Sequence, residues 1–470
     1  MKIPKYEKRI YKPFTTRSGE AFCQVKYGGR TQIFSLSSHE FEMEYKRIYR
    51  KQRKEMISRN QYEKILAVMR LDAYENRVDY DLETRIFREE DGTIIYNLNP
   101  DKSQAVYIKN GKATLEEMPE MRFKYDPSIR NQVEPDLKIK PHLLPKFLER
   151  HFHLKKDDLL VLSLFLVSAF SGTSTPHNIL ILAGSKGSGK SRAARLLLRI
   201  VDPQNLDLVS LPKTKDDLAI RLHNSYITVL DNISYLNSGF SDIIAQCATG
   251  GICYVKRTLY QNSEETKLDL RSILILTGIE VVAKKSDVKD RSILLFLERL
   301  KPDEIMGEKE LEEAFQEDLP KILGACLKLL AIAVNDDTPV DVPKTRMASA
   351  FELMVKVGRA MGFDDEYAAD ILWKNQKKVS LHTIFDSSFG ECINAFFEEY
   401  ESFTGLVREF KEEIQKLAKD RHMAKNVVPE ETNVFSRRLG EIQSELELLY
   451  GIKYKKRSNG RYHEIDIWVE

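Results

Sequence analysis

The sequence has few cysteines and no long apolar segment, and these two absences exclude several classes of protein. The five cysteines are scattered and form no CxxC pair. That pattern argues against a disulfide-stabilised secreted scaffold and a zinc ribbon, and it favours the reducing cytoplasm. The longest apolar run, residues 159–170, is too short to span a bilayer, so neither an integral membrane protein nor a membrane partner is expected.

Charge is unevenly distributed, although the net charge of the 470 residues is only +2. Residues 1–60 carry 15 Lys/Arg against 6 Asp/Glu, a balance of +9, so residues 61–470 sum to −7. Residues 41–68 are predicted to form a long helix with one aromatic and one basic face. This pattern suits a nucleic-acid partner, but it equally describes a solvated amphipathic helix.

The length and the 42% apolar content indicate a globular protein of several domains. Between residues 141 and 340, helices alternate with apolar strands that lack a two-residue period, which predicts an α/β fold with a parallel sheet covered on both faces. The predicted domains are an α+β domain at 1–140, an α/β core at 141–340, a helical lid or linker at 341–430 and a winged helix at 431–470.

A glycine-rich segment, GSKGSGKS at residues 184–191, follows the strand NILILA and precedes the helix RAARLLLRI. We call it the glycine loop. Its pattern and context predict a site in which backbone N–H groups and a helix N-terminus surround the phosphates of ATP. Lys190 would place its charge near the γ-phosphate, and Ser191 would bind Mg²⁺. The predicted nucleotide ligands are Gly184, Ser185, Lys186, Gly187, Ser188, Gly189, Lys190, Ser191 and Arg192.

Three polar positions downstream follow or precede apolar strands. Asp231 ends one strand and is predicted to hold Mg²⁺ through its water shell. Thr277 ends another and is either a contact to the γ-phosphate or attacking water, or an ordinary strand terminus. Arg291 precedes a third strand, where it either reaches the nucleotide of a neighbouring subunit or pairs with Asp290 at the surface.

In combination, these motifs resemble the P-loop replication proteins of prophages and phage-inducible chromosomal islands, relatives of superfamily-III and minichromosome-maintenance-like helicases. The matching text is GSKGSGKS, VLDNIS, ATGG…KRTLYQNSEE, LTGI, KDRSILL and PKTRMA, with YGGRTQIFSLSSHEF near the N-terminus. The resemblance implies an AAA+ ring ATPase that moves along or melts DNA. It would make Arg291 a trans-acting arginine finger, Arg346 a sensor-2-like arginine and Thr277 the sensor-1 residue, where relatives commonly have asparagine.

One position departs from this pattern. Helicases of the broader class usually follow the metal-binding acid with a glutamate that activates water, whereas this chain has Asn232. An amide orients water but cannot accept a proton. Either Glu264, Glu265 or Glu280 serves as the base, or hydrolysis is slow.

Two basic hairpins are predicted to contact DNA. By similarity, the first lies between residues 252 and 270 and projects into the channel of the ring; on residues alone its cations are unremarkable for a surface hairpin. The second follows a C-terminal helix and turns at residues 458–460, which reads as a winged helix or a small packing domain. The predicted DNA contacts are Lys256, Arg257, Lys267, Arg437, Arg438, Lys455, Lys456 and Arg457.

The predicted function is that of an ATP-dependent DNA helicase and replication initiator of a mobile genetic element. It would act as a homohexameric ring on single-stranded and on forked or origin duplex DNA, with ATP and Mg²⁺ as cofactors. No primase active-site pattern is evident, so a primase would be a separate partner. The alternative is an ATP-controlled DNA-binding switch, an initiator or helicase loader that hydrolyses little.

Overall fold

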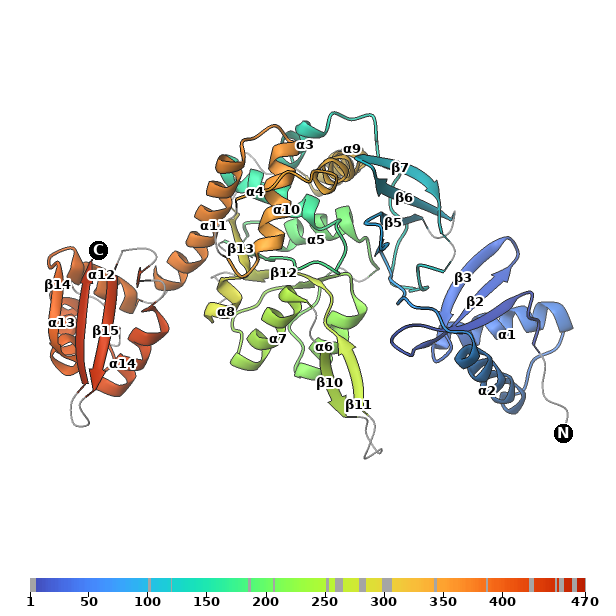
Figure 1. The fold of residues 1–470 in the computed structure, drawn as a ribbon, viewed down its shortest axis with the longest axis horizontal. Helices are drawn as coiled ribbons and strands as arrows, with labels where there is room; N and C mark the ends of the chain where they lie inside the picture. Colours follow the sequence, from blue (N-terminus) through green and yellow to red (C-terminus); the bar gives the residue numbers. More distant parts are fainter. Residues whose placement is uncertain are drawn as a thin grey trace.

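The computed structural model describes residues 6–99, 103–119, 121–184, 187–205, 208–250, 253–257, 265–278, 285–297, 307–341, 345–385, 388–421, 427–443, 446–447, 452–458 and 463–469. Figure 1 shows an N-terminal unit in blue, a central unit mainly in green and a C-terminal unit in red, arranged along the longest axis of the molecule.

The N-terminal unit is a small antiparallel sheet packed against two helices. The strands pair in the order β1-β2-β3, and the elements are β1 (Tyr11–Thr15), β2 (Ala21–Tyr27), β3 (Arg30–Ser35), α1 (His39–Arg53) and α2 (Arg59–Glu75). Phe41 and Tyr45 of α1 are buried in the core of this unit. The single helix predicted over 41–68 is wrong, because Lys54 adopts a left-handed conformation with φ 58° that ends α1, and Ser58 caps α2.

A second antiparallel sheet packs with the central unit. Its strands pair in the order β4-β5-β6-β7, with β4 (Ile86–Arg88), β5 (Ile94–Asn99), β6 (Gln104–Lys109) and β7 (Lys112–Glu117). One face of this sheet, which includes Ile94, Tyr96 and Val106, shares a hydrophobic cluster with the central helices. The fully buried Arg85 donates from Nε to Asp202 Oδ1 at 2.7 Å, and also to three backbone oxygens. The boundary between the N-terminal core and the central core therefore lies between α2 and β4, not after residue 140.

The central unit contains a parallel four-stranded sheet, as the sequence predicted. Its order is β13-β8-β12-β9, with β8 (Ile179–Ala183), β9 (Ile227–Leu230), β12 (Ile273–Gly278) and β13 (Ser292–Phe296), and every neighbouring pair is parallel. Alternate residues of β8 enter two different hydrophobic clusters, Leu180 in one and Ile181 in the other. Both faces of the sheet are thus covered. The surrounding elements are η2 (Pro141–Leu143), α3 (Leu144–Glu149), α4 (Lys156–Ser168), α5 (Lys190–Val201), α6 (Lys215–Asn224), α7 (Ser238–Thr249) and α8 (Ser286–Lys289).

The helices after the sheet also pack on the central unit. They are α9 (Glu308–Val334), α10 (Ala348–Ala360) and α11 (Asp365–Phe385). The buried amide of Asn375 in α11 accepts from Leu294 N–H at 2.9 Å and donates to the Leu294 carbonyl at 2.7 Å. This pairing satisfies the backbone of the edge strand β13 and ties α11 to the sheet, so the region predicted as a lid or linker at 341–430 is not one structural element.

The C-terminal unit has its own core, which begins at Phe389 in α12. Its order is helix, strand, helix, helix, strand, strand: α12 (Ser388–Phe397), β14 (Ser402–Leu406), α13 (Val407–Asp420), α14 (Thr432–Glu441), β15 (Ile452–Ser458) and β16 (His463–Val469). The strands form an antiparallel sheet in the order β14-β16-β15. The sequence predicted only the last helix and hairpin, so the unit starts well before residue 431. The predicted turn after Ser458 lies outside the described residues.

Candidate functional site

The glycine loop leaves β8 at the carboxyl edge of the parallel sheet and enters α5. Gly187 and Gly189 have φ values of 84° and 81°, a conformation that residues with a side chain rarely adopt. The first N–H groups of α5 have no intrahelical acceptor, and this helix end carries a positive partial charge. The loop therefore presents donors and positive potential together. Ser185 and Lys186 lie outside the described residues.

The polar side chains of the loop fit a phosphate group. Lys190 Nζ donates to the carbonyl of Gly184 at 2.7 Å, and burial lowers the pKa of Lys190 while Asp231 acts in the opposite direction. The hydroxyl of Ser188 is buried, and no other described residue forms a hydrogen bond with it. A phosphate oxygen would supply an acceptor for both groups. Arg192, in the first turn of α5, is partly buried, and burial lowers its pKa.

Ser191 and Asp231 lie together beside this loop. The Ser191 hydroxyl is 2.9 Å and 3.0 Å from the two carboxylate oxygens of Asp231, which follows β9. An alcohol and a carboxylate oxygen are the ligand types that Mg²⁺ takes, together with water and phosphate oxygens. No three His, Cys, Asp or Glu side chains gather as a metal site within the described stretches. A cation at Asp231 would therefore need oxygens from water or a bound phosphate.

Thr277 holds the turn that carries Asp231. Its hydroxyl donates to Asp231 Oδ1 at 2.5 Å and accepts from the backbone N–H of Asn232 at 2.9 Å. Asn232 has a positive φ of 55°, which these contacts stabilise. The structure thus brings Thr277 to the site through Asp231, a contact that the sequence analysis did not foresee. Of the alternative bases, Glu264 and Glu280 and the side chain of Glu265 lie outside the described part.

Arg291 and Arg346 meet at one carboxylate. Arg291 donates from Nη1 to the Asp287 carbonyl at 2.6 Å and to Asp287 Oδ1 at 3.3 Å, and from Nε to Thr249 Oγ1 at 3.1 Å. Arg346 also bonds the Asp287 carboxylate, and its Nε is 3.7 Å from Asp290. The alternative pairing of Arg291 with Asp290 is therefore wrong, since Asp287 takes that place. Neither Asp287 nor Thr249 was identified from the sequence.

These arginines lie at the opposite edge of the sheet from the glycine loop. Strands β13 and β8 are parallel, with Ser292 beside Ile179 and Phe296 beside Ala183. Arg291 precedes the start of β13, whereas the loop follows the end of β8. Five residues at about 3.3 Å each separate the two edges by roughly 16 Å. Arg291 therefore does not contact the loop of its own chain.

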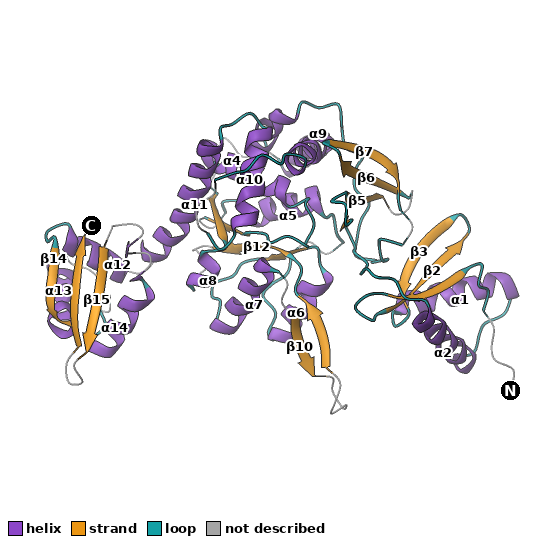
Figure 2. Cartoon of the chain, in the orientation of Figure 1, coloured by secondary structure: helices purple, strands orange, loops and turns teal. Residues whose placement is uncertain are grey.

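The hairpin predicted to grip DNA is present and extends from the central unit. Strands β10 (Cys253–Arg257) and β11 (Glu265–Asp269) pair with each other and form a sheet separate from the central one, and Figure 2 shows them extending beyond α6 and α7. Lys267 is exposed, and its cross-strand partner Val255 is 49% exposed. The side chains of Lys256 and Arg257 lie outside the description.

The predicted cations of the C-terminal unit have unequal surroundings. All five are classed as exposed: Arg437, Arg438, Lys455, Lys456 and Arg457. Contacts within the unit hold several of them: Lys456 donates to the Ser436 carbonyl at 2.8 Å, Arg457 lies 3.1 Å from Asp466, and Arg438 lies over a phenylalanine ring. Lys455 lies 5.9 Å from the ring centre of Trp468. The structure brings these cations onto one small unit, away from the glycine loop.

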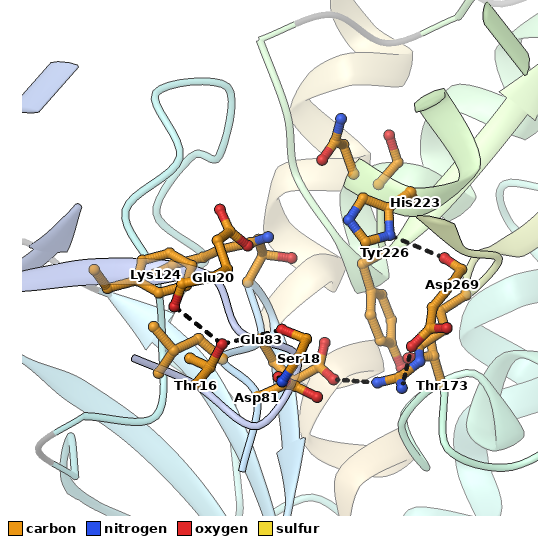
Figure 3. Close-up of a pocket in the computed structure, with 16 residues that line it drawn as sticks. Thr16, Ser18, Glu20, Asp81, Glu83, Lys124, Thr173, His223, Tyr226 and Asp269 are labelled. Atoms are coloured by element: carbon orange, nitrogen blue, oxygen red, sulfur yellow. Dashed lines mark hydrogen bonds and ion pairs between the residues drawn. The ribbon is translucent and has the colours of Figure 1, made fainter. Parts of the chain in front are cut away.

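A separate cavity of about 80 Å³ lies where the N-terminal unit meets the central unit (Figure 3). His223 donates to the carbonyl of Asp269 at 3.0 Å, and Arg271 lies 2.7 Å from the Asp269 carboxylate and 3.6 Å from Glu83. Burial raises the pKa of Glu83 to about 7, against the opposing charges of Arg271 and Lys124. Because Asp269 ends β11, this cavity connects the base of the hairpin with the segment leading from the N-terminal unit.

Within the described residues, no helix combines the length and the apolar character needed to cross a bilayer. Solved structures give likenesses at low identity. A C-terminal region of NrS-1 is 12% identical with a TM-score of 0.40 over 98% of this chain and 97% of that chain, and its A form is 13% identical with a TM-score of 0.38 over 98% and 96%. A ligand-bound JCV helicase is 13% identical with a TM-score of 0.26 over 49% and 67%. Likenesses with scores this low say nothing about the function of this chain.

No curated protein gives a significant match. One family model does match, and it is described as the Actinomycete integrative conjugative element replication protein. The match covers residues 150–371, which include the parallel sheet, the glycine loop and both arginines. The central part of this chain is therefore similar to the replication proteins of mobile genetic elements.

Proposed function

We propose that the chain is an AAA+ P-loop ATPase that hydrolyses ATP to move on DNA and separate its strands during replication of a mobile element. The observation that carries this proposal is the convergence of Lys190, Ser191 and Asp231 at one edge of the parallel sheet. These are the residue types with which P-loop NTPases hold a nucleotide and its metal. The similarity of residues 150–371 to a replication protein family supports the biological setting.

Each group of the site has a distinct task in this proposal. The glycine loop and α5 receive the phosphates, Lys190 exchanges its bond to Gly184 for a phosphate oxygen, and Ser191 and Asp231 hold Mg²⁺ directly or through water. When bound there, Mg²⁺ would supply positive charge to offset the charge that develops on the phosphate. Thr277 keeps Asp231 in place by its 2.5 Å hydrogen bond. Asn232 orients the attacking water, with a glutamate from outside the described residues as the base.

The position of the two arginines supports an oligomeric ring. Arg291 lies at the edge of the sheet opposite the glycine loop, roughly 16 Å away by strand rise, and Arg346 meets it there at Asp287. They can stabilise transferring phosphate only at the site of a neighbouring chain. Such a head-to-tail contact repeats until it closes, which makes a homohexameric ring our proposed assembly. Asp287 then acts as the group that both arginines leave when the neighbouring site fills.

Two elements would contact DNA. The β10–β11 hairpin, which carries Lys267, extends from the central unit and would enter the channel of the ring. The C-terminal unit has the helix-strand-helix-helix-strand-strand order of a winged helix, with Arg437 in α14 and Lys455 in β15 as phosphate contacts. A primase would be a separate partner.

The proposal is tested by measuring ATP hydrolysis and strand separation of a forked duplex by the purified protein. We expect DNA to stimulate hydrolysis, and Lys190→Ala to abolish both activities. Lys374→Ala is the matched control, because that lysine is 66% exposed on α11 and its ion-pair partner, Asp370, lies on the same helix. Equal hydrolysis with and without DNA, together with an intact fork, would refute a motor function.

The second candidate is an ATP-controlled switch, an initiator or helicase loader with little hydrolysis, and Asn232 favours it. Single-turnover hydrolysis by wild type and Asn232→Glu separates the two candidates. A switch gains hydrolysis when the carboxylate is introduced, whereas a motor with another base already hydrolyses ATP and gains little. A wild-type rate near zero that rises in the variant would favour the switch.

A further inference from the structure

A groove runs along the N-terminal unit beside the edge strand β3. Three adjoining cavities of about 750, 590 and 310 Å³ share two lining residues, Gln32 of β3 and Tyr125. Helix α1 lines the largest of them. The Tyr125 backbone N–H donates to the Ile33 carbonyl at 2.6 Å, so the segment carrying this ring is fixed to the strand edge.

The groove is mainly basic. Its charged lining residues are Arg30, Lys46, Arg47, Arg50, Lys51, Lys124 and Arg130, against Glu40, Glu44 and Asp126. Arg47 neutralises Glu44 through two hydrogen bonds of 2.5 Å and 2.6 Å. Among the described residues, Arg30, Arg50 and Lys51 have no carboxylate within ion-pair distance. These three cations remain available to an anionic ligand.

Aromatic and soft apolar side chains accompany the cations. Tyr125 is 41% exposed, and its ring centre lies 4.8 Å from that of Phe34 at 45°. Tyr27 lies 5.9 Å from the guanidinium of Arg47. Met43 and Met56 are 52% and 69% exposed on the same lining. Of the two α1 tyrosines that suggested nucleic acid, Tyr45 is buried and Tyr49 does not line the groove, so the rings in this groove come from β2, β3 and the segment at 125.

We propose that this groove binds single-stranded DNA, at a site distinct from the hairpin and the C-terminal unit. Cations that follow the backbone, combined with open rings on which bases stack, are the two requirements of such a site. Duplex DNA is usually contacted by an element that protrudes into its major groove, whereas these cations line a depression. An acidic peptide would use the cations but not the partly exposed ring of Tyr125. The inference rests on the proposed function for its choice of DNA, but it requires neither ATP binding nor hydrolysis.

The test uses the full chain without nucleotide and a fluorescein-labelled oligothymidylate, with anisotropy as the readout. Loss of a stacked base weakens binding by about 5- to 150-fold, so we expect that change in Tyr125→Ala. Tyr125→Phe keeps the ring and should bind within about twofold of wild type. The triple variant R30Q/R50Q/K51Q should lower the slope of log affinity against log salt by about 2, since each phosphate contact to single strands contributes about 0.7.

Photo-crosslinking of an oligonucleotide that carries 5-iododeoxyuridine locates the bound strand independently of other DNA sites. We expect crosslinked peptides at Tyr125 or from α1. Unchanged affinity and salt slope in the variants, with crosslinks elsewhere, would overturn the proposal. So would an equal loss of blunt-duplex binding, which would indicate a duplex surface, or a loss of polyglutamate binding without crosslinks, which would indicate a protein-docking surface. Lys190→Ala should keep this binding, so failure of the motor and failure of the groove are distinguishable.

Discussion

Replacement of Thr277 by valine removes one hydroxyl group and keeps the shape of a side chain that is only 1% exposed. That hydroxyl donates to Asp231 Oδ1 at 2.5 Å and accepts from the Asn232 N–H at 2.9 Å. The variant therefore loses a hydrogen bond to a carboxylate and leaves a backbone donor without its acceptor. Asp231 keeps its contact with Ser191.

Both losses have known magnitudes. A hydrogen bond to a charged group contributes about 1.5–3 kcal/mol, and an unsatisfied buried donor costs about 1–3 kcal/mol. Because Asn232 is exposed, water can replace the acceptor that its N–H loses, so the lost bond to the carboxylate dominates and we expect a fall of about 1.5–3 kcal/mol in unfolding free energy. A displaced Asp231 should lower kcat by roughly 10- to 100-fold. Affinity for ATP should change by less than about threefold, since Lys190 and the glycine loop are untouched.

Steady-state hydrolysis gives kcat, and calorimetric titration with a non-hydrolysable ATP analogue gives the affinity. Thr277→Ser is the matched control, because serine retains the hydroxyl and loses only a methyl group. It should retain most of the turnover. A valine variant with wild-type turnover, or a serine variant as impaired as the valine one, would refute the positioning role of Thr277.

Three further changes have outcomes that follow from single sites. Arg85→Met should destabilise the central unit by about 3–5 kcal/mol in urea unfolding, because the Asp202 carboxylate, 1% exposed, loses its ion-pair partner; an equal loss in R85M/D202L would contradict this. The folded pKa of Glu83, about 7, exceeds its unfolded value of 4.5, so stability should fall by about 3 kcal/mol as pH rises through that interval. Glu83→Gln should flatten the dependence of unfolding free energy on pH. An unchanged slope in this variant would show that another group causes the dependence. Gly184→Ala should weaken ATP binding by at least about tenfold, because a Cβ would lie 2.6 Å from the Leu297 carbonyl; calorimetric titration with wild-type affinity would contradict that clash.

The parallel sheet was predictable because its apolar strands are bounded by clear helices and turns. A continuous apolar segment such as residues 179–183 is stable only in a sheet that is covered on both faces. The polar residues that bound such a segment therefore indicate where the strand ends. Since carboxyl ends of parallel strands share an edge, the sequence order also placed Asp231 near the glycine loop. Their 2.9 Å contact through Ser191 agrees with that expectation.

Boundaries and partners were less predictable, because they depend on tertiary contacts. Residues 86–117 read as part of an N-terminal domain, yet the buried bond between Arg85 and Asp202 joins that sheet to the central unit across 117 positions in the sequence. Strand β14 is short and partly exposed, so its sequence did not predict a strand. The pairing of Arg291 with Asp287 across one helical turn could have been anticipated from the i, i+4 spacing.

The central claim, that the glycine loop binds ATP and that its hydrolysis acts on DNA, is tested most directly by one comparison. The hydrolysis rate of the wild-type chain is measured with and without a forked duplex, beside Lys190→Ala under the same conditions. The account predicts a wild-type rate that rises with the fork and a variant rate indistinguishable from background in both. A variant that hydrolyses ATP as fast as wild type, or a wild-type rate that the fork leaves unchanged, would contradict it.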